Sequence, residues 1–196
     1  PHIERVALVS TTLFEEWAAG RGMEGPLFER QRERLRIAAQ LHDLGKIGIS
    51  DTLLKNPGRL TPEDFAQVKK HVLIGARLFS DHSTDFDQAA QDVALNHHER
   101  WDGGGYPGHV TSVDGGMMMT GAGKRGDEIP LFARIVGLAD VYDALLSRRS
   151  YKEPWTPRRA QAYIREESGK HFDPDLVEIF FRRLRDIEEH YERFPP

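Results

Sequence analysis

The sequence predicts an all-α fold made of a single domain. Apolar residues recur at three- and four-residue intervals along most of the 196 residues, whereas no alternation of apolar and polar residues persists over four positions. The pairs Thr61-Pro62, Thr156-Pro157 and Asp173-Pro174 each place a capping residue before a proline, which is typical of a helix start. We therefore expect one helical domain over residues 1–196. Because the sequence begins at Pro1, we interpret it as a piece of a longer protein with a sensory or regulatory region before it.

The expected helices follow one another along the chain. The first begins at His2, and the second should end near Gly45, because glycine accepts a left-handed backbone at no steric cost. Later helices are expected over residues 61–78, 86–98 and 130–146, and from residues 156 and 173 onward. Residues 99–128 are rich in glycine and contain three consecutive methionines, and we expect them to form a long loop.

Composition excludes several classes of protein. The net charge of −4 argues against a coat for a nucleic-acid polymer or a protein of the membrane surface. The chain has no cysteine, which excludes disulfides and cysteine zinc sites. No apolar run approaches the roughly 20 residues that span a bilayer, and no signal peptide is visible. We therefore expect a cytoplasmic protein without membrane insertion of this domain.

Histidine and carboxylate residues recur at places that suggest a metal centre. His42-Asp43 lies near the expected helix end at Gly45, and His97-His98 closes another helix before a glycine-rich loop. Such ligands suit iron, manganese, nickel or zinc sites that carry out hydrolysis. Taken alone, His42-Asp43 is better explained as a polar helix end, and His97-His98 is explained equally well in that way. Their occurrence together, with Lys46 one turn after the first doublet, favours a phosphohydrolase.

Three further residues are candidate ligands of differing strength. Asp140 interrupts an apolar helical run, and a buried carboxylate needs a partner or a metal. His71 lies in a polar helical stretch and would by itself be a surface residue. His2 is the weakest candidate. The remaining histidines are expected to be solvated or packed: His82, His109, His171 and His190.

With these residues in view, the sequence resembles the HD-GYP group of the HD phosphohydrolase superfamily. The matching stretches are residues 41–71, 96–108, 127–153 and 170–180, so the resemblance covers nearly the whole chain. The combination of HDLGK, HHERWDGGGYP and ADVYDAL is far more specific than a lone His-Asp pair. The resemblance implies a helical HD-type domain with a metal cleft that hydrolyses cyclic di-GMP to linear pGpG, from which GMP could follow.

The resemblance also implies individual roles. Metal ligands are expected at His2, His42, Asp43, His71, His97, His98 and Asp140. Asp43 would bridge two divalent ions, with iron or manganese expected first and nickel or zinc as alternatives. Lys46 is expected to touch the scissile phosphate and, with Asp43, to carry the catalysis. Substrate binding is expected at Lys46, Asp143, Arg149, Lys152, Gly105, Tyr106 and Pro107.

Two departures from the family pattern limit these expectations. Trinuclear members have a glutamate one turn before the first-helix histidine, a place that would fall before Pro1, so a third metal is doubtful. The loop at residues 108–127 is longer than usual, and its methionines and Lys124-Arg125 could partly cover the cleft or be a flexible insertion without a role.

Two rival functions remain open. The first is hydrolysis of another cyclic or linear nucleotide by the same fold and ligands. The second is a weakly active signalling module that binds cyclic di-GMP or contacts proteins, such as a GGDEF diguanylate cyclase, through the GYP loop. Degenerate modules usually lose metal ligands, whereas this chain keeps nearly all of them, which favours an enzyme.

Overall fold

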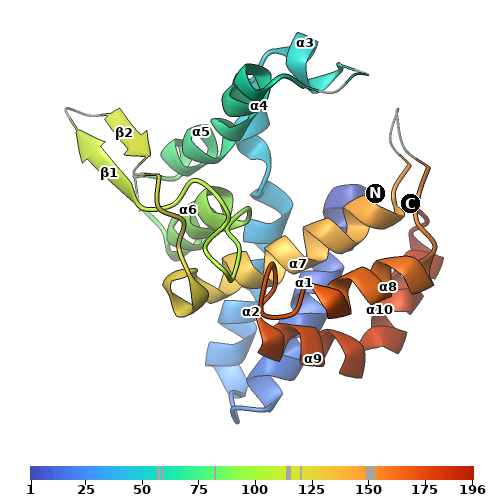
Figure 1. The fold of residues 1–196 in the computed structure, drawn as a ribbon. Coiled ribbons are helices and arrows are strands. Elements are labelled where there is room, and N and C mark those ends of the chain that lie inside the picture. Colours follow the sequence, from blue (N-terminus) through green and yellow to red (C-terminus); the bar gives the residue numbers. More distant parts are fainter. Residues whose placement is uncertain (57, 59, 82, 114–115, 120, 149–152) are drawn as a thin grey trace.

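The fold is helical, as the sequence predicts. The computed structural model describes residues 1–196 apart from 57, 59, 82, 114–115, 120 and 149–152. Figure 1 shows the arrangement of the elements. The α-helices are α1 (His2–Ala19), α2 (Gly25–Leu41), α3 (Asp51–Leu54), α4 (Pro62–Lys69), α5 (His71–Leu78), α6 (Asp85–Asn96), α7 (Leu131–Leu146), α8 (Pro157–Glu166), α9 (Pro174–Arg182) and α10 (Leu184–Arg193).

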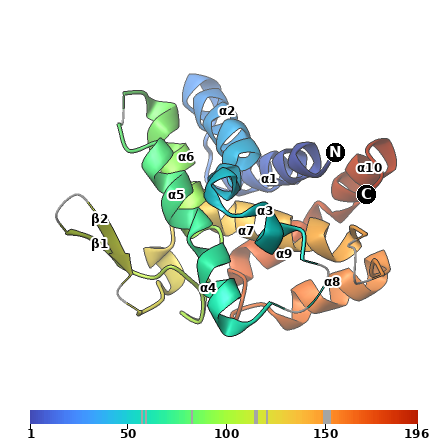
Figure 2. The ribbon, with the colours of Figure 1, turned by 90° about the horizontal axis from the view of Figure 1, so that it is seen from above.

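The hydrophobic core lies around α7, which runs through the middle of the molecule (Figures 1 and 2). Nearly every residue of α7 from Ala133 to Ala139 is buried, because helices contact it from more than one side. The amphipathic helices α1, α8, α9 and α10 turn their apolar faces toward the same core. Among the described residues, no helix has the length and apolarity needed to cross a membrane.

The predicted helix starts at residues 61, 156 and 173 are confirmed. Thr61 and Asp64 form a reciprocal capping box at the start of α4. The Thr156 side chain accepts a hydrogen bond from the Arg159 amide, and the Asp173 side chain accepts one from the Asp175 amide. These contacts satisfy amide groups that the first turn of a helix leaves without partners.

Two expected helices are each divided in the structure. The single helix predicted over residues 61–78 is two helices, α4 and α5, because the backbone tightens into a three-residue turn at Lys70, whose amide bonds to the Gln67 carbonyl. The helix expected from residue 173 ends at Arg182, and α10 begins at Leu184. Periodicity alone misses these breaks because the apolar face continues across them.

The expectation that residues 99–128 form a long loop is wrong in the middle of that segment. Strands β1 (Val110–Val113) and β2 (Gly116–Met119) pair as an antiparallel hairpin, with Val110 opposite Met119. The short helical turn η2 (Gly126–Glu128) follows. Each strand has four residues, which is too short for an alternating pattern to emerge. Both ribbon views show the hairpin projecting from the body beyond α5 and α6 (Figures 1 and 2).

Candidate metal centre

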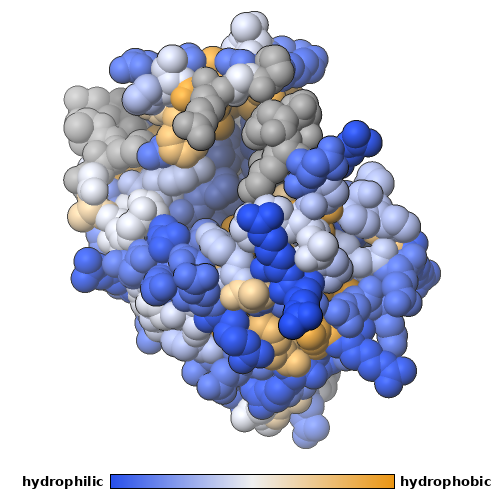
Figure 3. All heavy atoms as spheres, turned by 45° about the vertical axis from the view of Figure 1, so that its right-hand side comes forward, coloured by the Kyte–Doolittle hydropathy of each residue, from blue (hydrophilic) through white to orange (hydrophobic). Residues whose placement is uncertain are grey.

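The predicted metal ligands come from distant parts of the chain and meet in one place. His42 and Asp43 follow α2, His71 opens α5, and His97 and His98 follow α6. Asp140 lies within α7, and His2 is the first residue of α1. Figure 3 shows a hollow with a hydrophilic floor below the part of the surface formed by α3 and α4.

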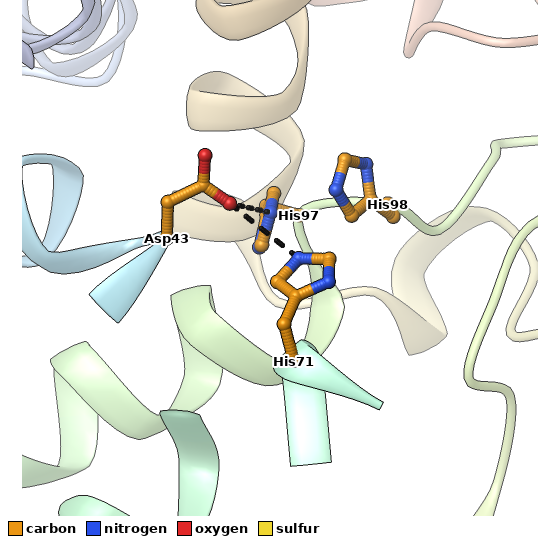
Figure 4. A group of neighbouring side chains, drawn as sticks. All are labelled: Asp43, His71, His97 and His98. Atoms are coloured by element: carbon orange, nitrogen blue, oxygen red, sulfur yellow. Dashed lines mark ion pairs between the residues drawn. The ribbon is translucent and has the colours of Figure 1, made fainter. Parts of the chain in front are cut away.

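Four of these side chains form a first group, drawn in Figure 4. Ligand atoms of Asp43, His71, His97 and His98 all lie within 4.8 Å of one another. The Oδ1 atom of Asp43 is 3.5 Å from Nε2 of His71 and 3.8 Å from Nε2 of His97. These separations leave room for a cation between the donor atoms rather than for direct hydrogen bonds.

A second group lies on the other side of the same carboxylate. It consists of His2, His42 and Asp43. Oδ2 of Asp43 is 3.5 Å from Nε2 of His42. Asp140 adjoins this group, because its Oδ1 atom lies 3.8 Å from Nε2 of His42 and 3.6 Å from Nε2 of His2. Asp43 therefore turns one oxygen toward each group.

Three of the histidine rings, those of His42, His71 and His97, are oriented as metal ligands require. The Nδ1 atoms of His42 and His71 each lie 2.7 Å from a backbone carbonyl, of Ala39 and Val68 respectively, and Nδ1 of His97 lies 3.0 Å from the Val93 carbonyl. A carbonyl only accepts, so Nδ1 carries the hydrogen and Nε2 keeps its lone pair.

Among the described residues, those lone pairs have no hydrogen-bond partner. The Nε2 atoms of His42, His71 and His97 and the Oδ1 atom of Asp43 are buried without a hydrogen bond. Leaving several buried polar atoms unpaired costs free energy, and a divalent cation coordinated by them would remove that cost. The donor set of neutral imidazoles and carboxylates thus fits a metal ion.

Two glycines allow the backbone segments to approach closely enough for this convergence. A Cβ atom on Gly45 would lie 1.9 Å from the His71 carbonyl oxygen, and one on Gly137 would lie 2.7 Å from the His97 carbonyl oxygen. The expectation that Gly45 ends a helix through a left-handed backbone is wrong: α2 already ends at Leu41, and Gly45 lies in the 3₁₀ helix η1 (Leu44–Gly48). Its missing side chain instead lets η1 lie directly against α5.

The electrostatics of the centre favour an ionised Asp43 and neutral His71 and His98, whereas the pKa of His42 is raised because Asp43 and Asp140 outweigh the effect of burial. Burial opposes the charge on Asp43, but attraction to the nearby His42 and His97 rings and to the Lys46 ammonium outweighs it and holds the pKa of Asp43 far below its usual range. Burial, together with the nearby charge of His97, lowers the pKa of His71 to about 4. The same causes lower the pKa of His98 well below its usual value. Neutral imidazoles are the form that binds metal.

Asp143 does not face the open site. Its side chain is fully buried, and its oxygens contact Nδ1 of His2 at 2.7 Å and Nε of Arg5 at 2.5 Å. Ser147 donates a further hydrogen bond of 3.1 Å. Burial would raise the pKa of Asp143, but His2 and Arg5 lower it to about 2. The substrate-binding role expected for Asp143 would therefore require breaking an internal network. Arg149 and Lys152 lie outside the described residues.

Arg5 is a residue of this network that matches the family pattern after His2, but sequence reasoning gave it no role. It is 3% exposed, and its guanidinium also donates to the carbonyl oxygens of Phe194 and Pro195. A lone arginine on the polar side of a first helix gives no sign of burial in the sequence; only its position one turn after His2 could have suggested the pairing.

The lysine and the GYP segment lie at the edge of the centre. The Lys46 ammonium pairs with Oδ2 of Asp43, and its side chain remains 41% exposed. Tyr106 stacks on His98 with ring centroids 4.8 Å apart. Gly105 passes so close to the chain that a Cβ atom there would lie 2.4 Å from the Arg100 amide nitrogen. Pro107 is buried. The three GYP residues thus form a turn packed against His98.

Glu99 is a second residue whose role sequence reasoning missed. Its buried carboxylate accepts hydrogen bonds from the Gly108 amide at 2.6 Å and the Lys124 amide at 3.2 Å. Lys124 also donates from its ammonium to the Asn96 side chain at 2.6 Å. Glu99 therefore joins the two ends of the segment that carries the hairpin. The signal available in the sequence was its position directly after the His97-His98 doublet.

Comparisons with known proteins agree with this site. A model of the HD domain family matches residues 1–145, and a second HD domain model matches residues 116–176. A cyclic di-GMP phosphodiesterase of Thermotoga maritima is 40% identical over 98% of this chain and 46% of its own length. A 3′3′-cGAMP-specific phosphodiesterase of Vibrio cholerae is 34% identical over 98% of this chain and 31% of its own length. The chain thus spans less than half the length of these relatives.

A solved structure shares the fold. An HDG"Y"P protein from Bdellovibrio bacteriovorus superposes with a TM-score of 0.60 at 24% identity, over 95% of this chain and 52% of that one. At this identity the likeness extends to the architecture alone.

Proposed function

Because the chain belongs to the HD domain family, within its HD-GYP group, we propose that it is a metal-dependent phosphodiesterase that hydrolyses cyclic di-GMP. The product is linear pGpG, which a second cleavage would convert to GMP. One observation carries the proposal: Asp43 presents one oxygen to each of two ligand groups, in which the Nε2 atoms of His42, His71 and His97 are buried without a hydrogen-bond partner among the described residues. Sites of this kind, with two cations sharing a carboxylate, hydrolyse phosphate esters.

We assign the ligands to two divalent cations. His71, His97 and His98 would hold one, His2, His42 and Asp140 would hold the other, and Asp43 would contact both. Iron and manganese come first among the candidates, with nickel and zinc as alternatives. Cations bound here would supply a hydroxide nucleophile near neutral pH and offset phosphate charge.

Protein side chains would bind the substrate and stabilise the transition state. Lys46, half-exposed beside Asp43, would donate to a phosphoryl oxygen on which charge builds in the transition state. Tyr106 stays a neutral phenol, because burial raises its pKa above the usual value. Arg149 and Lys152 remain proposed contacts of the second phosphate. Contact of the GYP loop with a GGDEF protein likewise stays a prediction.

A second substrate has a specific observation behind it. The 34% identity to a 3′3′-cGAMP-specific phosphodiesterase extends over almost the whole chain. Cyclic di-GMP and 3′3′-cGAMP share two phosphodiesters and differ in one purine, so the same metal centre serves both. The choice between them must come from contacts with the bases.

The test combines metal content with turnover. The protein is purified without oxygen, its metals are measured by elemental analysis, and hydrolysis of cyclic di-GMP and 3′3′-cGAMP is followed by chromatography. We expect about two metals per chain, as in other two-metal sites, and faster hydrolysis of cyclic di-GMP. Asp81→Ala, which removes an exposed carboxylate beyond the far end of α5 from His71, is the control. Metal-loaded protein that cleaves neither dinucleotide would overturn the proposal.

A further inference from the structure

An aromatic corner lies beside the metal centre, one ring beyond His98. Tyr106 stacks on His98, and Phe65 of α4 meets Tyr106 edge to face, with ring centroids 6.2 Å apart and planes at 80°. The ammonium of Lys69, one turn after Phe65 on α4, lies 4.7 Å from the Phe65 ring centroid and 5.0 Å from that of Tyr106. We call Phe65, Lys69 and Tyr106 the aromatic corner.

Phe65 does not serve the hydrophobic core. Its side chain is 44% exposed, and no residue of α4 is buried. The core cluster of buried residues does not include it. Burying a large aromatic side chain away from water is favourable. A phenylalanine that is half-exposed beside a reaction centre would therefore be stabilised by a ligand that covers its ring.

The surroundings restrict what could cover it. The corner carries a cation, and it is joined through His98 to the group of ligands that would hold a metal ion near the scissile phosphate. The occupant must therefore be flat and apolar on its face and must also carry negative charge. A purine nucleotide meets both conditions, because its base stacks on aromatic rings while its phosphate attracts an ammonium group.

We propose that the aromatic corner is a binding site for one purine base of the cyclic dinucleotide, with Phe65 as the stacking surface and Lys69 as a contact for the adjoining phosphate. The inference rests on the proposed function for its substrate. It adds two residues of α4, Phe65 and Lys69, to the site. Since α4 leads directly into α5, which begins with His71, the stacking surface is connected to the metal ligands through a single turn at Lys70.

The test uses two substitutions at one position and a matched control. Phe65→Ala removes the ring, whereas Phe65→Tyr keeps it. Phe86→Ala removes another exposed phenylalanine, which is 40% exposed at the opposite end of α6 from His97. The ligand is a cyclic dinucleotide with one base replaced by 2-aminopurine, whose fluorescence is quenched when it stacks on an aromatic ring. Kinetics with cyclic di-GMP and with bis(p-nitrophenyl) phosphate, a diester without purines, are measured in parallel.

In Phe65→Ala we expect the KM for cyclic di-GMP to rise about tenfold, which is typical of losing one stacked base. The quenching should be lost, and metal content should stay unchanged. The kcat with bis(p-nitrophenyl) phosphate should stay close to that of the unsubstituted protein, because this diester has no purine that could stack on Phe65. Phe65→Tyr and Phe86→Ala should behave like the unsubstituted protein.

Three results would overturn the inference. Unchanged quenching and KM in Phe65→Ala would show that no base binds at the corner. An equal loss with the purine-free diester would show that Phe65 supports the metal centre instead. A change of oligomeric state without a change of KM would assign the corner to a protein contact. Failure of the proposed function can be distinguished from failure of this inference. If quenching depends on Phe65 but the protein does not hydrolyse the dinucleotide, the base-binding site is supported and the phosphodiesterase activity is rejected.

Discussion

Nδ1 of His2 lies 2.7 Å from a carboxylate oxygen of Asp143, while Nε2 of the same ring lies 3.6 Å from Asp140 at the metal centre. A carboxylate on one ring nitrogen fixes the tautomer and the orientation of a histidine whose other nitrogen binds metal. The buried guanidinium of Arg5 holds that carboxylate in turn. Asp143 is thus placed to position His2, a task that the sequence did not predict, and the expected substrate contact of Asp143 stays a prediction.

Asp143→Asn tests this assignment. The change removes the charge that faces Arg5, so metal affinity should fall about 10–100-fold, as for other carboxylates that orient metal-binding histidines. The protein should also lose roughly 3 kcal/mol of unfolding free energy, because a buried arginine is left without its counter-charge. Elemental analysis after dialysis and denaturant unfolding of the metal-free protein measure the two effects. A raised KM with normal metal content and stability would instead support substrate contact.

Asp43→Ala should remove metal from both groups, since no other residue in the described part of the chain offers an oxygen to each. Turnover should fall below about a tenth of the unsubstituted value, as loss of a metal ligand normally costs far more than that. Elemental analysis and a cyclic di-GMP assay check both outcomes against Asp81→Ala. Full retention of one metal would show that Asp43 does not bridge.

Lys46→Ala should separate chemistry from metal binding. An ammonium group has no lone pair to donate to a metal, so metal content should stay near normal. Turnover should fall by about 10² or more, comparable to losing one donor that stabilises transition-state charge. The measurement is kcat together with metal content. Loss of metal in this variant would place the Lys46–Asp43 pair in the structure of the centre rather than in catalysis.

The hairpin offers a test of the predicted partial cover over the cleft. Replacing residues 111–126 would remove the Lys124 amide that bonds to Glu99, so a cleaner change replaces residues 111–120 with a short Gly-Ser linker. If the hairpin covers bound substrate, the KM for cyclic di-GMP should rise several-fold on the scale of a few lost contacts, with metal content unchanged. Glu99→Gln, which weakens the anchor but keeps the hairpin, should shift KM in the same direction. Unchanged kinetics in both variants would leave the hairpin without a role in this reaction.

His171 should make the metal-free protein sensitive to acid. Burial, with the positive charge of Arg100 nearby, lowers the pKa of His171 to about 4. In the unfolded chain the histidine has an ordinary pKa of about 6.5. At a pH between the two pKa values, His171 is therefore protonated in the unfolded chain but neutral in the folded protein. The stability of the folded protein that depends on neutral His171 is therefore fully present above pH 6.5, and it is lost as the pH falls toward 4. The loss of Tm between pH 7.5 and 5.0 should be smaller in His171→Gln than in the unsubstituted protein; an equal loss would assign the acid sensitivity to other groups.

The sequence by itself determined the helical class, the helix starts at Thr61, Thr156 and Asp173, and the identity of the residues that gather at the centre. These properties are local. A capping side chain reaches only the next turn, and a histidine or an aspartate has its ligand chemistry wherever it lies. The resemblance to a family adds the expectation that these residues meet, because members of a family share a fold and the motifs occupy the same places in it.

Only the tertiary structure decided which contacts each of these side chains makes. In the folded protein each oxygen of Asp43 faces a different ligand group, and Asp143 points inward to Arg5 and His2. Glu99 joins the two ends of the hairpin segment. The tertiary structure also showed that Gly45 is needed for the close approach of η1 to α5 rather than for ending α2. Each of these depends on groups far apart in the chain coming within a few ångströms. That proximity is set by packing around α7, and no pattern of neighbouring residues encodes it.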